Sequence, residues 1–314
     1  MPRAKLMSLC NGAELPVLGL GTAKCDNVYG AVQAAIEAGY THFDTAYAYH
    51  NEAELGRALR DSIRTGRVTR EQLWLTTKVW NSYHRTQQVE ECFQRSAMAL
   101  GVDYVDLYLM HWPIAFREGH EGRVEDGPPC TTDVDFLDCW RGMEELYMEG
   151  RVRNIGVSNF NSEQMTRLLT HCTIKPLVNQ VEANVYLNQE KLRLFCAQRG
   201  VTLIAYSPLG SPGYKRTPAG ADAPKPLADP TVASIATSHG KTPAQVLLRF
   251  LIQRGIAAIP KSSNPQRIQE NIEVFDFHLS PEDMSSLMAL NRGYRRFTVD
   301  NLKHHKFYPF NTEF

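Results

Sequence analysis

The stretch YTHFDTAYAYHNEAELGRALRDSIRTGRVTREQLWLTTK, residues 40–78, contains two strand-like runs separated by one helix-like segment. The runs YTHFD (40–44) and LWLTTK (73–78) are short and apolar, as strands covered on both faces are. The segment NEAELGRALRDSIRTG (51–66) has helical periodicity, with Asn51 as its expected N-cap and Gly66 just past its end. This order predicts a βαβ unit with two parallel strands.

The same alternation continues along almost the whole chain. Further helix-like segments cover residues 28–40, with Gly39 as a stop, 87–101, 135–150 and 188–200. The other strand-like runs are VLGLG (17–21), VDLYLM (105–110), NIGV (154–157), LVNQV (177–181), TLIAY (202–206) and IAAIP (256–260). Eight such units predict an α/β fold, a (β/α)8 TIM barrel forming a single domain over residues 1–314. An open doubly wound sheet is the alternative.

Four features interrupt or flank this alternation. The runs KLMSL and ELPVL around Asn11-Gly12 predict an N-terminal β-hairpin. Residues 114–133 and 208–230 are long loops rich in Gly, Pro and charge, and each follows a strand. Both are therefore expected at the C-terminal face of the barrel, where they are candidate lids. The aromatic tail of residues 292–314 is expected to lie against the body of the protein.

Composition narrows the kind of partner and the compartment. The 314 residues include 34 Lys and Arg and 34 Asp and Glu, so no net charge favours nucleic acid or an anionic membrane. The N-terminus MPRAKLMSLCNG lacks the apolar stretch of a signal peptide, and no run approaches a membrane span. The 7 cysteines are scattered without a C-x-x-C pair, which favours free thiols. We expect a cytoplasmic protein that binds a small molecule.

Four polar residues lie at or just past the ends of three successive strand-like runs: Asp44, Tyr49, Lys78 and His111. A barrel of parallel strands brings such ends together. Tyr49 is the predicted general acid; because a tyrosine in water has a pKa of about 10, a cation at Lys78 is needed to stabilise its phenolate. Asp44 would pair with Lys78, and His111 would donate a hydrogen bond to the substrate oxygen. Each residue alone has a structural explanation, but together they favour protonation of a carbonyl oxygen.

Other motifs indicate how a nucleotide is bound. GLGT (19–22) lacks the third glycine of a dinucleotide fingerprint, with Lys24 in its place, which disfavours a Rossmann site. Lys261, Ser262 and Arg267 flank the start of a predicted helix and could bind a phosphate, although an ordinary basic helix start has the same pattern. No metal site is expected, because the histidines show no paired ligand spacing with nearby carboxylates (His42, His50, His84 and His111).

The chain resembles the aldo-keto reductase superfamily, and is most similar to its aldehyde and aldose reductase-like branch. The motifs that carry the resemblance are HFDTAYAYHNE (42–52), TTKVW (76–80), DLYLMHWP (106–113), IGVSNF (155–160), AYSPLGSP (205–212), IPKSSNPQRIQEN (259–271) and the ending YPFNTEF (308–314). The resemblance implies a TIM barrel that binds NADPH in extended form. Hydride would pass from the nicotinamide to a carbonyl carbon while a tyrosine delivers the proton.

The resemblance also implies roles for individual residues. Asp44, Tyr49, Lys78 and His111 match the catalytic tetrad, with Asp44 also among the cofactor contacts. The remaining cofactor positions are Ser158, Asn159 and Gln180 at the carboxamide, Tyr206 under the nicotinamide, Thr22, Ser207, Leu209 and Ser211 on the pyrophosphate side, Lys261, Ser262 and Arg267 at the 2′-phosphate, and Glu270 and Asn271 at the adenine. The cations at the 2′-phosphate position favour NADPH over NADH.

The substrate pocket is expected to have apolar walls around a few polar groups. Its predicted lining is Ala23, Tyr49, Trp80, His111, Trp112 and Phe116. Ala23 departs from the branch, which usually has tryptophan there, and this should widen the pocket. A second departure is EANVY (182–186), where relatives tend to carry His-Pro; we expect it to affect loop shape more than chemistry.

The segment from Arg292 to His305 would complete the pocket wall. Its charged residues Arg295, Arg296 and Asp300 are unusual for an apolar pocket, and the sequence leaves open whether they face the pocket or solvent. The sequence thus predicts a monomeric NADPH-dependent reductase of apolar carbonyl compounds, including bulky ketones and long-chain or aromatic aldehydes. The alternative is a cofactor-binding redox sensor or structural barrel without turnover, against which the intact tetrad counts.

Overall fold

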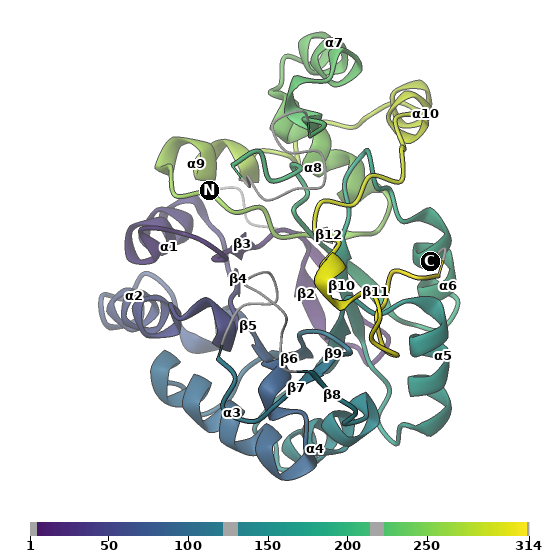
Figure 1. The fold of residues 1–314 in the computed structure, drawn as a ribbon. Coiled ribbons are helices and arrows are strands. Elements are labelled where there is room, and N and C mark those ends of the chain that lie inside the picture. Colours follow the sequence, from purple (N-terminus) through teal and green to yellow (C-terminus); the bar gives the residue numbers. More distant parts are fainter. Residues whose placement is uncertain (1–4, 122–130, 214–222, 313) are drawn as a thin grey trace.

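The computed structural model describes residues 5–121, 131–213, 223–312 and 314, and its centre is one sheet of eight parallel strands (Figure 1). The strands are β3 (Leu20–Gly21), β4 (His42–Asp44), β5 (Trp74–Val79), β6 (Leu107–Met110), β9 (Ile155–Ser158), β10 (Val178–Glu182), β11 (Thr202–Tyr206) and β12 (Ala257–Ala258). The first and last are joined, since Gly19 N donates to Ala258 O at 2.9 Å and Gly21 N to Pro260 O at 3.1 Å. The sheet therefore closes on itself, and the predicted TIM barrel is confirmed.

Helices surround the barrel, as Figure 1 shows. They are α1 (Val28–Ala38), α2 (Glu52–Arg64), α3 (Thr86–Leu100), α4 (Phe136–Met148), α5 (Ser162–His171), α6 (Glu190–Ala197), α7 (Pro230–His239), α8 (Pro243–Gln253), α9 (Pro265–Ile272) and α10 (Pro281–Ala289). Gly39 ends α1 with φ 98°, a left-handed conformation that glycine adopts without strain. All four helix-like segments predicted besides residues 51–66 contain a helix.

Asn51 precedes α2 as predicted, but its side chain does not cap the helix. Its Nδ2 donates to Thr22 O at 2.9 Å, and its Oδ1 accepts from Thr45 Oγ1 at 3.0 Å. Both partners lie just past a strand, after β3 and β4 respectively. Asn51 is therefore the N-cap residue, as predicted, with its backbone carbonyl accepting from Leu55 N at 3.1 Å, while its side chain joins two strand ends to the start of the helix.

The predicted hairpin is present and covers the N-terminal end of the barrel. Its strands β1 (Leu6–Ser8) and β2 (Glu14–Pro16) pair antiparallel. Leu9 and Leu15 are buried in a cluster with Trp74, Leu107 and Leu177, which lie at or near the starts of β5, β6 and β10. Apolar side chains thus fill this end, and the polar strand ends gather at the other.

The two long loops are only partly described. In the first, β7 (Ala115–Phe116) pairs antiparallel with β8 (Thr131–Thr132), while residues 122–130 lie outside the described residues. In the second, residues 214–222 lie outside them, and the short 3-10 helix η5 (Pro226–Ala228) follows. Whether these loops act as lids stays a prediction.

The aromatic tail is held against the body, as predicted. Asn161 Nδ2 donates to Pro309 O at 3.0 Å, Gln164 Nε2 to Phe307 O at 2.9 Å, and Ser162 Oγ to Phe314 O at 2.7 Å. All three donors lie in or just before α5. The tail is therefore fixed by polar contacts with one helix start.

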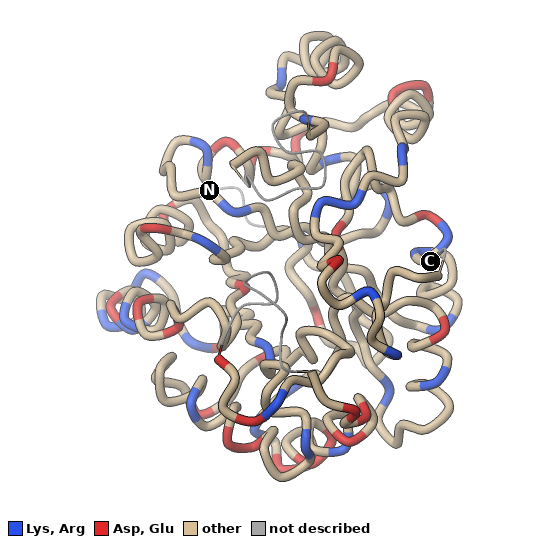
Figure 2. The backbone as a smooth tube through the Cα atoms, in the orientation of Figure 1, with Lys and Arg blue, Asp and Glu red and all other residues tan. Residues whose placement is uncertain are grey.

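The distribution of surface charge and the state of the cysteines are as the composition predicts. Basic and acidic residues are interspersed around the helices in Figure 2. The six cysteines within the described ranges are free thiols; Cys130 lies outside those ranges. No helix in the part of the chain that the structure describes is long and apolar enough to cross a membrane. Among those same residues, no group of three or more His, Cys, Asp or Glu side chains is placed to hold a metal ion.

Candidate active site

A buried ion pair lies at the C-terminal ends of β4 and β5. Lys78 Nζ lies 2.6 Å from Asp44 Oδ1 and also donates to Thr45 O at 2.7 Å, and the Lys78 side chain is 0% exposed. Burial lowers the pKa of Lys78, and the attraction of Asp44 opposes this shift. The second Asp44 oxygen accepts from Gln180 Nε2 at 2.7 Å. Both charges therefore have partners, and the ammonium is fixed in one position.

Tyr49 and His111 lie beside this pair. Tyr49 ends the 3-10 helix η1 (Tyr47–Tyr49), which follows β4, and the centre of its half-buried ring is 5.1 Å from Lys78 Nζ. The His111 ring meets the Tyr49 ring edge-on, with 5.6 Å between centroids. Burial and the charge of Lys78 hold the pKa of His111 well below its usual range. The structure thus brings the four predicted residues together, with a neutral imidazole beside the phenol.

The predicted carboxamide residues connect directly to this group. Ser158 Oγ donates to Gln180 O at 2.8 Å, and Asn159 Nδ2 donates to His111 O at 3.0 Å. Tyr206, the last residue of β11, donates its hydroxyl to Asn159 Oδ1 at 2.8 Å. Asn159 has φ 62°, an uncommon conformation for a residue with a side chain. Hydrogen bonds therefore fix the half-exposed Tyr206 ring relative to His111.

The predicted phosphate-side residues fall into two groups. Thr22 is buried beside β4, since its Oγ1 donates to Asp44 O at 3.0 Å. In the turn after β11, which also contains the half-buried Leu209, Ser207 and Ser211 have φ of 51° and 45°, and their hydroxyls are 2.7 Å apart. This second group lies near the first along the barrel mouth, because β3 adjoins β12 and β12 adjoins β11.

The start of α9 carries the predicted 2′-phosphate residues. Lys261 and Arg267 are exposed, and no ion pair joins either to another described residue. Ser262 is buried and accepts from Asn264 N at 3.1 Å, while Glu270 accepts from Gln266 Nε2 at 3.0 Å and Asn271 is buried. The two exposed cations therefore stand on either side of a helix N-terminus, a favourable place for an anion.

Aromatic side chains surround His111. The Trp80 ring lies edge-on to both His111 and Phe116, with centroids 5.2 and 5.7 Å apart. Trp112 packs edge-on against Phe310 at 6.0 Å. Phe310 belongs to the tail, and the sequence did not single it out because no pattern marks which tail aromatic reaches the barrel. Trp80, Trp112 and Phe116 are all buried, so they can serve both core and pocket.

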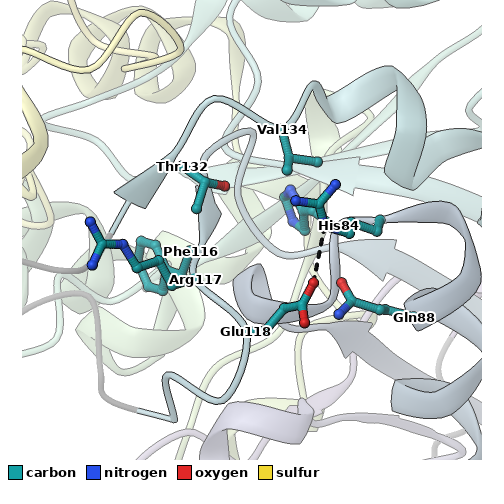
Figure 3. Close-up of a pocket in the computed structure, with 8 residues that line it drawn as sticks. His84, Gln88, Phe116, Arg117, Glu118, Thr132 and Val134 are labelled. Carbon is teal, nitrogen blue, oxygen red and sulfur yellow. Dashed lines mark hydrogen bonds and ion pairs between the residues drawn. The ribbon is translucent and has the colours of Figure 1, made fainter.

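A separate cavity of about 290 Å³ shares Phe116 with this region (Figure 3). Its lining is His84, Arg85, Gln88, Phe116, Arg117, Glu118, Thr132 and Val134, and it contains none of the four predicted catalytic residues. Arg85 Nε pairs with Glu118 Oε1 at 3.0 Å on its rim, and Arg117 extends away from His84. The cavity is therefore distinct from the group around Tyr49.

Known proteins share both the sequence pattern and the fold of this chain. The sequence model of the Aldo/keto reductase family matches residues 11–292. The chain belongs to that family. It is 42% identical over 323 residues to aldo-keto reductase family 1 member A1 of Mus musculus, covering 98% of both chains, and 40% identical over 315 residues to aldo-keto reductase AKR2E4 of Bombyx mori, covering 98% and 99%.

Solved structures of other aldo-keto reductases have the same fold. The Bombyx mori aldo-keto reductase AKR2E4 in complex with NADP gives a TM-score of 0.89 at 39% identity, covering 98% of this chain and 99% of that one. The aldose reductase of Schistosoma japonicum gives 0.91 at 39% identity, with 99% and 100% covered. AKR2E5 complexed with NADPH gives 0.90 at 38% identity, with 99% and 95% covered. The resemblance seen in the motifs is confirmed, and this aldo-keto reductase is an oxidoreductase.

The charged residues of the C-terminal segment do not all face solvent. Asp300 is exposed at the start of η6 (Asp300–Leu302), and Arg295 lies over the Phe310 ring at 3.9 Å. Arg296, however, is only 5% exposed, and its Nη2 donates to Pro224 O at 2.8 Å. The sequence left the placement of these charges open, and the structure buries Arg296, whose guanidinium reaches a carbonyl from a distant segment.

Buried histidines should make this aldo-keto reductase sensitive to acid. Burial lowers the pKa of His84 to about 3, so only the unfolded chain binds a proton there between pH 6.5 and 4. Protonation of this histidine in the unfolded chain should therefore lower the free energy of unfolding of wild type as pH falls below 6.5. Between pH 6.5 and 4 this loss should be about 3 kcal/mol in wild type, and His84→Gln should not show it. Urea unfolding across this pH range measures the effect.

The exposed His304 provides the control for replacing a histidine, since a surface substitution should change the free energy of unfolding by less than about 0.5 kcal/mol. Buried carboxyls such as Glu52, whose pKa burial raises, act in the opposite sense in wild type and variant alike. The comparison of His84→Gln with wild type therefore isolates one group. Parallel pH profiles for the two proteins would contradict the prediction.

Proposed function

We propose that this aldo-keto reductase reduces an aldehyde or ketone to the alcohol with NADPH, with Tyr49 as the general acid. The observation that carries the proposal is the buried Lys78–Asp44 pair beside the Tyr49 ring, at the end of the barrel where His111 also lies. Residues 1–314 would act as one barrel domain and as a monomer. The preferred substrates would be apolar carbonyl compounds, including bulky ones.

The residues at the barrel mouth fit the extended dinucleotide implied by the family resemblance. The Tyr206 ring, fixed through Asn159, offers a flat half-exposed face for the nicotinamide, and Ser158, Asn159 and Gln180 provide amide and hydroxyl groups nearby. At the other end, Lys261 and Arg267 offer exposed positive charge to a 2′-phosphate. Two of the solved relatives are complexes with NADP or NADPH. When bound, the cofactor supplies the hydride.

The chain's own groups would then handle the proton and the oxygen. The ammonium of Lys78 stabilises the Tyr49 phenolate left after proton transfer, and Asp44 keeps that ammonium charged against the effect of burial. The neutral His111 has one N–H, which can donate to the carbonyl oxygen and orient it toward Tyr49. Trp80 and Phe116 exclude water from this side of the site.

The direct test is NADPH oxidation, followed by absorbance, against carbonyl compounds from short aldehydes to bulky ketosteroids, with NADH in parallel. NADPH-dependent turnover supports the proposal, and turnover of the bulky members supports the wide pocket expected from Ala23. Tight NADPH binding without turnover of any member would instead favour a cofactor-binding sensor.

Replacing Arg267 with methionine should raise the KM for NADPH by about 10-fold or more, because a hydrogen bond to a charged group contributes about 1.5–3 kcal/mol. The KM for NADH, which lacks the 2′-phosphate, should not change. Gln269→Met, on the same helix and equally exposed, is the matched control. An equal rise for both cofactors would show that Arg267 does not act on the 2′-phosphate.

A further inference from the structure

A second cavity, of about 370 Å³, lies at the N-terminal end of the barrel. Of its lining residues, Cys10 comes from the turn of the hairpin and Arg193 from α6, while Thr202 begins β11 and Gly255 lies just before β12. These strand starts place the cavity at the opposite end of the barrel from the predicted catalytic residues. Its volume is within the range of small-molecule sites, about 300–1,000 Å³.

Two arginines that line this cavity, Arg193 and Arg254, share one carboxylate. Arg193 Nε and Nη2 donate to the two oxygens of Glu190 at 2.9 and 2.7 Å. Arg254 Nη2 donates to Glu190 Oε2 at 2.7 Å and to Asn188 O at 2.6 Å. The bonds from Arg193, together with those from Arg254, lower the pKa of Glu190 to about 2, so its carboxylate stays charged. Two positive charges therefore face one negative charge.

One nitrogen of this group lacks an acceptor. The Arg254 side chain is only 6% exposed, and its Nη1 is buried without a hydrogen-bond partner among the described residues. No acidic residue is among the described residues that line the cavity; Glu14, on the hairpin, accepts from the lining residue Ser8 but is not part of the lining. A carboxylate in the cavity would balance the excess charge and supply the missing acceptor.

A thiol lies on another wall of the same cavity. Cys10 is a free thiol and is the exposed one among the six described cysteines. A β-carbon added to Gly200 would lie 3.2 Å from Cys10 Cβ and 3.4 Å from Cys10 Sγ, so the thiol lies against the turn between α6 and β11. Gly200 has φ 75°, which favours glycine, and any side chain there would crowd the thiol. The cavity thus combines a nucleophile with an anion-binding group.

We propose that Cys10 is a modification site for low-molecular-weight disulfides that carry carboxylates, with Arg193 and Arg254 binding a carboxylate of the reagent. The Cys10 thiol loses its proton to water, and its thiolate attacks one sulfur of the disulfide. The reagent's sulfur–sulfur bond breaks as a new one forms to Cys10 Sγ, and the other half leaves as a thiolate that takes a proton from water. Cys10 is oxidised and the leaving half is reduced. The inference is independent of the proposed carbonyl reduction.

The first measurement compares three disulfides on the wild-type protein, with modification of Cys10 followed by peptide mass spectrometry. Glutathione disulfide carries carboxylates, bis(2-hydroxyethyl) disulfide is neutral and cystamine is cationic. The same chain unfolded in urea, which has no cavity, provides the reference rates. Because the chain has 34 basic and 34 acidic residues, its net charge creates no general preference for anions.

Folding should raise the ratio of the rate constants for glutathione disulfide and the neutral reagent at least about 10-fold, as expected for hydrogen bonds to a charged group. The ratio for cystamine and the neutral reagent should not rise. An equal ratio for glutathione disulfide in the folded and unfolded chains would overturn the proposal. This comparison needs no variant and no carbonyl turnover, so it decides the proposal whether or not the proposed function holds.

The second measurement assigns the carboxylate to the arginines. Arg193→Met keeps the Arg254–Glu190 pair and should lower the rate constant with glutathione disulfide about 5-fold or more, while that with the neutral reagent stays within about 2-fold. Arg199→Met is the matched control, because Arg199 is exposed just past the end of α6, donates to Phe195 O at 2.9 Å and does not line the cavity. It should change neither rate. An equal fall with both reagents in Arg193→Met would overturn the carboxylate site.

Discussion

Replacing Tyr49 with phenylalanine is expected to lower kcat for carbonyl reduction by about 10²–10⁴-fold, the usual contribution of a positioned general acid. The ring would still pack against His111, and Lys78 and Asp44 would still pair, so only the proton donor is lost. NADPH affinity, measured by fluorescence quenching, should stay within about 2-fold of wild type, because the Tyr49 ring lies beside Lys78 and His111, where the carbonyl is expected.

Tyr47→Phe is the matched control for this experiment. Tyr47 lies on the same 3-10 helix two residues earlier, but its hydroxyl is 3.2 Å from the Tyr83 hydroxyl and donates to Glu121 at 3.3 Å, away from Lys78. Its loss should leave kcat nearly unchanged. A similar fall in kcat for both variants would mean that the turn, and not the Tyr49 proton, is what catalysis requires. Normal turnover of Tyr49→Phe would contradict the proposed mechanism.

Replacing Lys78 with methionine should destabilise the fold by about 3–5 kcal/mol as well as abolish most activity. The reason is that Asp44 would remain buried as a carboxylate with only the Gln180 amide and no cation beside it. Urea unfolding of the protein without cofactor measures the first effect, and NADPH oxidation the second. The unpaired charge of Asp44 would cause the loss of stability. The loss of activity would follow because no cation stabilises the Tyr49 phenolate.

A double variant separates these two causes. Asp44→Asn with Lys78→Met removes both charges, so it should recover much of the lost stability while remaining inactive. Arg64→Met is the control for loss of a salt bridge in general, because its pair with Asp61 is exposed and should matter by less than about 1 kcal/mol. A double variant that is no more stable than Lys78→Met would show that the buried charges do not interact as described.

The barrel could be predicted because strands that are buried on both faces appear in the sequence as short, continuous apolar runs. Every one of the eight apolar runs contains a strand, although β3 and β12 are only two residues long. Their runs, VLGLG and IAAIP, are longer because apolar residues continue past the regular strand pairing to the bonds that close the barrel. Periodicity reports burial rather than pairing, so it could not predict where each strand stops.

The polar residues at strand ends were found for the same reason, because a lysine after an apolar run requires a partner. Glu182 also ends a strand, but it was not predicted as a site residue. The reason is that its partners are backbone N–H groups of Arg296 and Phe297, which leave no signal in the sequence. The burial of Arg296 could not be predicted for a related reason, since its acceptor is the carbonyl of Pro224. Contacts that depend on the backbone of distant segments lie beyond single-sequence reasoning.

The hairpin at the N-terminal end of the barrel has a consequence for how this enzyme could diversify. Leu9 and Leu15 close that end as part of an apolar cluster, at the opposite end of the barrel from the strand ends where Asp44 and Lys78 pair. Substitutions of these leucines should change the unfolding temperature but leave substrate preference alone. The end of the barrel that the hairpin closes is therefore separate from the end that carries the ion pair, so stability can change there without altering the site.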